Sequence, residues 1–209
     1  MGMLEEIYNA IVEGKVDDAA RGVERALDSG IEADDILKKS LTSAMDLVGV
    51  KFGEGEMFIP HVVWSAKAMQ AGMDLLKPHF SISQQSDRAR IIIGTTKGDI
   101  HDIGKNLVTI MLEGAGFKVF DLGVDVEPNI FVEKALQEKG DIIALSSLLT
   151  TTMLSMRDVV SLAKEKGLSS TKVIIGGAPV DMAFCKEIGA DAYGIDAMDA
   201  VRKVRDLLE

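Results

Sequence analysis

The sequence predicts an α/β fold in which a doubly wound parallel sheet follows a bundle of helices. Apolar residues recur at helical spacing through about the first 80 positions, and none of these positions has a strand pattern. From Arg90 onward, short apolar runs alternate with amphipathic stretches, which is typical of parallel strands covered on both faces. The 209 residues are enough for two such domains.

Four apolar stripes mark the N-terminal half. The first two begin at Leu4 and Ala20, and the others run through residues 37–48 and 62–76. Four amphipathic helices with short connections predict a small antiparallel four-helix bundle over residues 1–80.

A polar stretch separates the two halves of the chain. Residues 81–89 have no core pattern and come just after Lys77-Pro78, so we expect an interdomain linker there. Residues 90–209 are then predicted to form a second, Rossmann-like domain.

Five strands are predicted in the second domain, each followed by a helix. The expected strands are Arg90–Gly94, Phe117–Phe120, Asp141–Ser146, Lys172–Gly176 and a short one at Ala192-Tyr193. The expected helices are 104–114, 129–138, 153–166, 180–188 and 197–208. Five such units predict a flavodoxin-like sheet with strand order 2-1-3-4-5.

Composition argues against several classes of protein. No apolar run approaches the roughly 18 residues of a membrane span, and the acidic N-terminus lacks the basic start of a signal peptide. The only cysteine, Cys185, fits a reducing cytosol. A net charge of −10 would repel phosphate backbones. We therefore expect a cytoplasmic protein without membrane or nucleic-acid partners.

Unusual residues follow the predicted strands. In an open α/β sheet, ligands bind beyond the carboxyl ends of the strands, where neighbouring connections leave in opposite directions. The loop after the first strand is 98–104, and the loop after the third is 146–152. Further loops start at Gly176 and Tyr193. All four are expected to lie along the same edge of the sheet.

Two familiar ligand sites do not fit this edge. A Walker phosphate loop fails because Gly98 and Gly104 are one residue too far apart and Asn106 replaces the hydroxyl residue. A phospho-acceptor domain would have an aspartate at the end of the third strand, whereas Asp141 lies at its start.

A metal macrocycle fits this edge better than a bare metal ion does. A zinc site needs three or four protein ligands, and the edge offers one histidine, His101. A corrin ring brings four nitrogens, so one axial histidine suffices. His101 alone would fit a surface loop, and each glycine alone would fit ordinary turn chemistry. Their combination favours a large ligand, for which four glycines would leave room: Gly94, Gly98, Gly176 and Gly177.

This combination resembles the B12-binding domain family, whose signature is DxHxxG, then SxL, then GG. The sequence has Asp99-Ile-His-Asp-Ile-Gly104, Ser146-Ser-Leu148 and Gly176-Gly177, at spacings that suit the family. The segment from Val48 to Pro60 looks like the cap of methionine synthase and of the small corrinoid proteins of anaerobic methyl metabolism.

The resemblance implies a bound corrinoid, cobalamin or a related form, with His101 as the lower axial ligand of cobalt. Asp99 is implied to bond the other imidazole nitrogen, and Thr152 stands where the family has a serine, which completes a relay. The implied cofactor contacts are Phe52, Ile59 and Val62 in the cap, Gly98, Asp99, Ile100, His101, Asp102, Ile103 and Gly104 after the first strand, Ser146, Leu148, Thr150 and Thr152 after the third, and Gly176, Gly177, Tyr193 and Gly194 around the nucleotide tail.

The resemblance further implies a methyl-carrier subunit of a cobalamin-dependent methyltransferase system. Cobalt(I) would accept a methyl group from a substrate-specific methyltransferase, and methyl-cobalt(III) would deliver it to a second methyltransferase whose acceptor is a tetrahydropterin or a thiol. A reductive-activation protein is a further expected partner. Since the sequence holds no catalytic barrel of about 250 residues, we expect no methyltransferase activity from this chain alone.

Two other functions share parts of this layout. A B12-sensing regulator would carry a basic helix-turn-helix segment, but this chain starts almost directly on the bundle and is acidic. A corrinoid-mutase small subunit would lack the cap segment around Phe52–Pro60. The donor stays open among methylamines, methanol, methoxylated aromatics and glycine betaine, as do the acceptor, the corrinoid tail and the oligomeric state.

Overall fold

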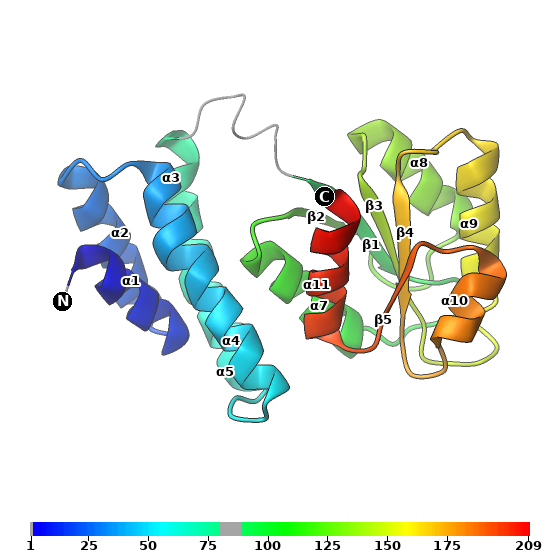
Figure 1. Cartoon of the computed structure of the whole chain (residues 1–209), viewed down its shortest axis with the longest axis horizontal. Helices are drawn as coiled ribbons and strands as arrows, with labels where there is room; N and C mark the ends of the chain where they lie inside the picture. The colour runs from blue at the N-terminus through cyan, green and yellow to red at the C-terminus, as the bar shows by residue number, and fades with distance from the viewer. Residues whose placement is uncertain (1, 80–88) are drawn as a thin grey trace. The chain divides into compact units, whose positions relative to one another are not determined.

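The structure is a computed structural model that describes residues 2–79 and 89–209 (Figure 1). Residues 81–88 of the predicted linker lie outside the described residues. The chain divides into two compact units: the N-terminal residues with Glu113–Gly116, and Ala89–Leu112 with Phe117–Glu209.

Four helical rods make up the described N-terminal residues, 2–79, as the apolar stripes predicted (Figure 1). The third rod is continuous from Ala33 to Gly53 but contains a π-helical turn. The elements are α1 Met3–Val12, α2 Val16–Asp28, α3 Ala33–Ile36, η1 Leu37–Thr42, α4 Ser43–Gly53, α5 Ile59–Leu76 and the short 3-10 turn η2 Lys77–His79.

Close helix approaches explain two glycines in the bundle. A Cβ atom on Gly22 of α2 would lie 2.8 Å from Ile7 Cγ1 of α1, so the two helices touch there. Gly14 has φ +69° in the α1–α2 turn, and its Cβ would lie 2.7 Å from Trp64 Cβ of α5. The side chains of Ile7, Ile11 and Leu41 are fully buried.

The second unit is a parallel five-stranded sheet, with the predicted strand order β2-β1-β3-β4-β5 confirmed. Its strands are β1 Arg90–Thr95, β2 Lys118–Asp121, β3 Ile142–Ser146, β4 Lys172–Gly176 and β5 Ala192–Gly194. Its helices are α7 Ile103–Gly114, α8 Pro128–Glu138, α9 Ser155–Glu165, α10 Met182–Ile188 and α11 Ala197–Leu208.

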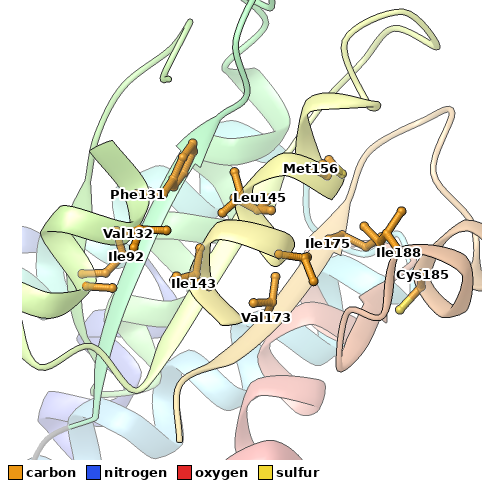
Figure 2. Close-up of a cluster of buried hydrophobic side chains, with 14 of the residues drawn as sticks. Ile92, Phe131, Val132, Ile143, Leu145, Met156, Val173, Ile175, Cys185 and Ile188 are labelled. Carbon is orange, nitrogen blue, oxygen red and sulfur yellow. The ribbon is translucent and has the colours of Figure 1, made fainter. Parts of the chain in front are cut away.

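Helices cover both faces of the sheet: α7 and α11 lie on one side, and α8, α9 and α10 on the other (Figure 1). An apolar cluster fills the space beneath α8, α9 and α10 (Figure 2). Alternate residues of a strand face the same side, so β3 contributes Ile143 and Leu145 to this cluster, and β4 contributes Val173 and Ile175.

Several boundaries differ from the prediction by one or two residues; helix α10, for example, begins at Met182 rather than at residue 180. Helix α9 begins at Ser155 rather than at residue 153, because the preceding residues are held in turns. Thr152 N–H donates to the carbonyl of Leu149 over 3.2 Å, and Ser155 N–H donates to the carbonyl of Thr152 over 3.1 Å. None of the helices in residues 2–79 and 89–209 is long and apolar enough to cross a membrane.

Candidate functional site

The loops after β1 and β3 meet at the carboxyl edge of the sheet. Thr96 N–H donates to the carbonyl of Ser146 over 3.0 Å, and the Thr96 hydroxyl donates to the carbonyl of Thr152 over 3.3 Å. These bonds extend the pairing of β1 and β3 past the strand ends. Residues 97–102 and 147–152 are therefore held side by side at the switch point of the sheet.

Asp99 is the centre of this junction, and its side chain is fully buried. Its Oδ1 accepts from the backbone N–H of His101 over 3.0 Å and lies 2.7 Å from His101 Nδ1. Its Oδ2 accepts from Leu148 N–H over 2.8 Å and from the Thr152 hydroxyl over 2.7 Å. Both oxygens of the buried carboxylate are thus engaged, as burial of a charge requires.

The charge on Asp99 decides the tautomer of His101. Burial by itself raises the pKa of Asp99, but the N–H groups of His101 and Leu148 and the hydroxyl of Thr152 together lower it well below its usual range. The carboxylate is therefore ionised at neutral pH and can only accept hydrogen bonds. Nδ1 of a neutral His101 ring must then carry the proton, which leaves the lone pair on Nε2.

The His101 ring is accessible, because 47% of its side chain is exposed. Nε2 is available either to a metal ion or as a base. No group of three or more His, Cys, Asp or Glu side chains in the described residues could hold a metal ion by itself.

Large apolar side chains next to His101 are also open to solvent. Ile100 is 74% exposed, Ile103 is 75% exposed and Leu148 is 44% exposed. Gly104 adds further open space, since a Cβ atom there would meet nothing within 4 Å. Exposed apolar groups near a single nitrogen that is able to bind a metal fit the face of a large, mostly apolar ring better than a hydrated ion.

Asp102, the last residue before α7, is bonded to Asn106 in the first turn of that helix. Its carbonyl accepts from Asn106 N–H over 2.7 Å, and its Oδ2 accepts from Asn106 Nδ2 over 3.0 Å. The amide oxygen of Asn106 in turn accepts from Lys105, which forms an ion pair with Asp121 at the end of β2. The start of α7, directly after His101, is therefore tied to the neighbouring strand.

At two of the glycines predicted to leave room for a ligand, protein atoms already occupy the place of a side chain. A Cβ atom on Gly94 would lie 2.8 Å from the Phe131 ring, which already fills that space. Gly177 has φ +130°, and its Cβ would lie 1.8 Å from the carbonyl oxygen of Ser147. Both glycines are needed because protein atoms approach closely.

Local backbone geometry explains why two further positions are glycine. Gly98 has φ +80°, a conformation that other residues rarely adopt. A Cβ on Gly176 would lie 3.2 Å from the carbonyl oxygen of Gly194, where β4 and β5 run together.

The remaining residues implied by the sequence lie in varied surroundings. Tyr193 packs against the apolar cluster of the sheet, and Thr150 is exposed. In the first unit, Phe52 is half-buried, Ile59 is 44% exposed and Val62 is fully buried.

Sequence reasoning missed Ser147. Its side chain is buried, and its hydroxyl lies 2.7 Å from Thr152 Oγ1 and 3.2 Å from Asp99 Oδ2. Ser147 occupies the variable position of the SxL motif, so the motif gave no reason to single it out. A hydroxyl residue directly after a buried strand, in the loop that also carries Thr152, was the available signal.

Comparison with known proteins gives matches over both units. Residues 89–202 and residues 3–77 each match a family described as B12 binding domain. The chain is 41% identical to dimethylamine corrinoid protein 3 of Methanosarcina acetivorans, over 99% of this chain and 97% of that protein. It is 43% identical to trimethylamine corrinoid protein 2 of Methanosarcina mazei, over 99% and 96%.

A solved structure is similar as well. The methanol:cobalamin methyltransferase complex of Methanosarcina barkeri contains a chain that matches with a TM-score of 0.89 and 30% identity. The match covers 99% of the present chain and 79% of that chain.

Proposed function

Because this chain belongs to the B12-binding family of corrinoid proteins, we propose that it carries methyl groups on the cobalt of its corrinoid from a substrate-specific methyltransferase to a second methyltransferase. The chain binds cobalamin or a related corrinoid, as its family does. When bound, the corrinoid supplies a cobalt centre that accepts and releases a methyl group.

One observation carries the proposal. His101 Nδ1 lies 2.7 Å from a buried, ionised carboxylate, so Nε2 is left as an exposed electron-pair donor. In the proposed function, Nε2 is the lower axial ligand of cobalt. Asp99 keeps the proton on Nδ1 and fixes the plane of the ring, as carboxylates behind metal-bound histidines do.

The other side chains of the site bind and enclose the ring. Ile100, Ile103 and Leu148 offer apolar contact that excludes water from beneath it. The hydroxyls of Thr152 and Ser147 donate hydrogen bonds to the buried Asp99 carboxylate. Phe52 and Ile59 are proposed to shield the upper face, whereas Val62 is fully buried and is not available for this role. Gly176, Gly177, Tyr193 and Gly194 are proposed to line the pocket of the nucleotide tail.

The proposed partners follow from the relatives. A chain similar to this one belongs to a methanol:cobalamin methyltransferase complex, and other relatives are named as corrinoid proteins of dimethylamine and trimethylamine. We propose a methyltransferase as donor partner, a second methyltransferase acting on a tetrahydropterin or a thiol, and a reductive-activation protein. Cys185, a buried thiol, supports a reducing, cytoplasmic location.

The first experiment tests the axial ligand. The protein is loaded with hydroxocobalamin, and its absorption spectrum is compared with those of His101→Ala and of His79→Ala, an exposed histidine of the bundle that serves as control. We expect base-off, His-on ligation in the wild type and in the control, and its loss together with weaker corrinoid retention in His101→Ala. A spectrum that His101→Ala leaves unchanged overturns the assignment.

The second experiment tests methyl carriage without assuming a donor. The loaded protein is reduced, given labelled methyl iodide and passed through a desalting column in the dark. We expect stoichiometric label that light releases and that a candidate acceptor methyltransferase removes. Methylamines and methanol, each with its methyltransferase, then replace methyl iodide. Label that does not stay with the loaded protein contradicts the proposed function.

A further inference from the structure

Thr95, the last residue of β1, joins three segments of the site. Its side chain is fully buried, and its hydroxyl donates to the carbonyl of His101 over 2.9 Å. Its N–H donates to the carbonyl of Gly123 over 2.9 Å, and its carbonyl accepts from Val126 N–H over 3.0 Å. One residue thus ties the His101 loop to the loop that follows β2.

The loop after β2 holds the His101 loop through a second residue, Asp125. Asp125 N–H donates to the carbonyl of Asp99 over 2.9 Å, and Asp125 Oδ1 accepts from Gly98 N–H over 2.7 Å. Asp125 has φ +53°, an uncommon conformation for a residue other than glycine. Residues 98–101 are therefore fastened to the loop after β2 as well as to the loop after β3.

His101 is consequently held at both ends of its own backbone. Its N–H is fixed by Asp99 Oδ1 over 3.0 Å. Its carbonyl is fixed by the Thr95 hydroxyl at the end of β1. Because the two bonds restrain the peptide groups before and after the residue, they set the direction in which the Cα–Cβ bond points. The bond from Asp99 to Nδ1 then sets the rotation of the ring.

We propose that Thr95 is a positioning residue for the axial imidazole, acting through the carbonyl of His101. The proposal rests on the proposed function, in that His101 is taken as the ligand of cobalt. A metal ligand must be held close to its productive geometry by groups behind it. Without the Thr95 hydroxyl, the His101 carbonyl loses its donor and the residue can turn about its backbone.

A purely structural role is the competing explanation, because any buried hydroxyl needs a partner. Thr171 provides a matched control. It is also buried, and its hydroxyl also donates to a backbone carbonyl, that of Gly140, over 2.8 Å. Thr171 and Gly140 precede β4 and β3, so this bond lies at the opposite edge of the same sheet.

The experiment compares Thr95→Val and Thr171→Val, each loaded with hydroxocobalamin. The pH midpoint between His-off and His-on ligation is read from the absorption spectrum, and stability is read from urea unfolding. Protonation of the imidazole competes with binding to cobalt, so weaker ligation moves the midpoint to higher pH. We expect Thr95→Val to weaken ligation roughly fivefold, the equivalent of about 1 kcal/mol, and to raise the midpoint by about 0.7 pH unit. Thr171→Val is expected to lose similar stability without moving the midpoint.

A second pair of variants isolates the hydroxyl. Thr95→Ser keeps it and Thr95→Ala does not, and neither adds bulk, so the comparison stands even if the valine variant fails to fold. In corrinoid-free protein, NMR of the His101 ring provides an independent reading. We expect the Nδ1–H tautomer in the wild type and in Thr95→Ser, and averaged ring signals in Thr95→Ala.

Two failures are distinguishable. If Thr95→Val keeps the midpoint of Thr171→Val and Thr95→Ala keeps the ring signals of the wild type, the positioning role is wrong while axial ligation stands. If His101→Ala leaves the spectrum of the loaded protein unchanged, axial ligation itself is wrong.

Discussion

The two edges of the sheet use the same polar chemistry with opposite results. At the amino edge, Asp141 Oδ2 accepts from Arg90 N–H over 2.7 Å, and Asp191 Oδ2 accepts from Val173 N–H over 2.8 Å. Each carboxylate there holds the first residues of a neighbouring strand. At the carboxyl edge, Asp99 holds backbone too, but it also holds an imidazole whose second nitrogen is left over.

The difference shows what makes one edge a site. A hydrogen bond between a carboxylate and a backbone N–H stabilises the fold but leaves no further group to contact a ligand. When the carboxylate instead engages a side chain with two functional nitrogens, one nitrogen is oriented and the other is presented. Exposed Ile100 and Ile103 beside that nitrogen add the apolar surface that a ligand can cover.

The largest expected effect is that of Asp99→Asn. The amide can accept at only one atom, so its NH2 group faces donors such as Leu148 N–H, and the buried N–H and hydroxyl groups lose a charged acceptor. We expect a loss of about 3 kcal/mol in the free energy of unfolding, together with loss of His-on ligation. Asp141→Asn, the amino-edge control, should cost about 1 kcal/mol and leave the corrinoid spectrum unchanged. Equal losses of unfolding free energy in the two variants would contradict the proposed difference between the two edges.

Acid should selectively remove the contribution of Asp99 to the free energy of unfolding. Its pKa is lower in the folded protein than in the unfolded chain, so its stabilising contribution is complete above the unfolded value, about 4, and falls as the pH drops below it. The test compares His101→Ala with the double variant Asp99→Asn/His101→Ala, so that the imidazole does not titrate. The gap in unfolding free energy should be constant from pH 7 to 5 and narrow below about pH 4. A gap that already narrows near pH 6 would show that Asp99 is not held ionised.

Gly177→Ala tests the close approach of the β3 and β4 loops. An added Cβ would lie 1.8 Å from the carbonyl oxygen of Ser147, so the backbone that carries the Asp99 contacts must move. We expect a loss of about 2 to 3 kcal/mol and weaker corrinoid retention. Gly167→Ala is the control, with φ +77° and nothing within 4 Å of its Cβ, and should cost about 1 kcal/mol. Similar losses in the two variants would mean that backbone conformation alone explains Gly177.

Local patterns predicted the fold well, because its elements depend on local periodicity. The apolar runs that form β1, β3 and β4 were recognisable, and alternation with helices fixed the parallel order that the structure confirms. The spacing of Asp99 and His101 within one loop indicated a pair, and the structure brings the two side chains together.

Contacts between loops could not be predicted in the same way. Ser147 and Thr95 act through residues far along the chain or across a turn, and neither has a pattern that separates it from other buried hydroxyls. Gly94 and Gly177 were assigned to ligand space because the positions of Phe131 and of the Ser147 carbonyl are tertiary facts.

The smallest expected effect is also the most specific test of the Asp99 junction. Thr152 donates to Asp99 Oδ2 over 2.7 Å, and the Ser147 hydroxyl lies within reach of both, 2.7 Å from Thr152 Oγ1 and 3.2 Å from Asp99 Oδ2. If Thr152 becomes Val, Ser147 can still donate to the carboxylate. Each single loss, Thr152→Val or Ser147→Ala, should therefore cost only about 1 kcal/mol.

The double variant removes both hydroxyl donors, so it should cost about 1 kcal/mol more than the sum of the two single variants. Urea unfolding of the four proteins measures this coupling. Thr152→Val combined with Thr171→Val, whose hydroxyl bonds Gly140 at the amino edge, should instead be additive. Additive costs in both pairs would mean that the two hydroxyls do not share Asp99, and that the carboxyl edge is built from independent bonds like the amino edge.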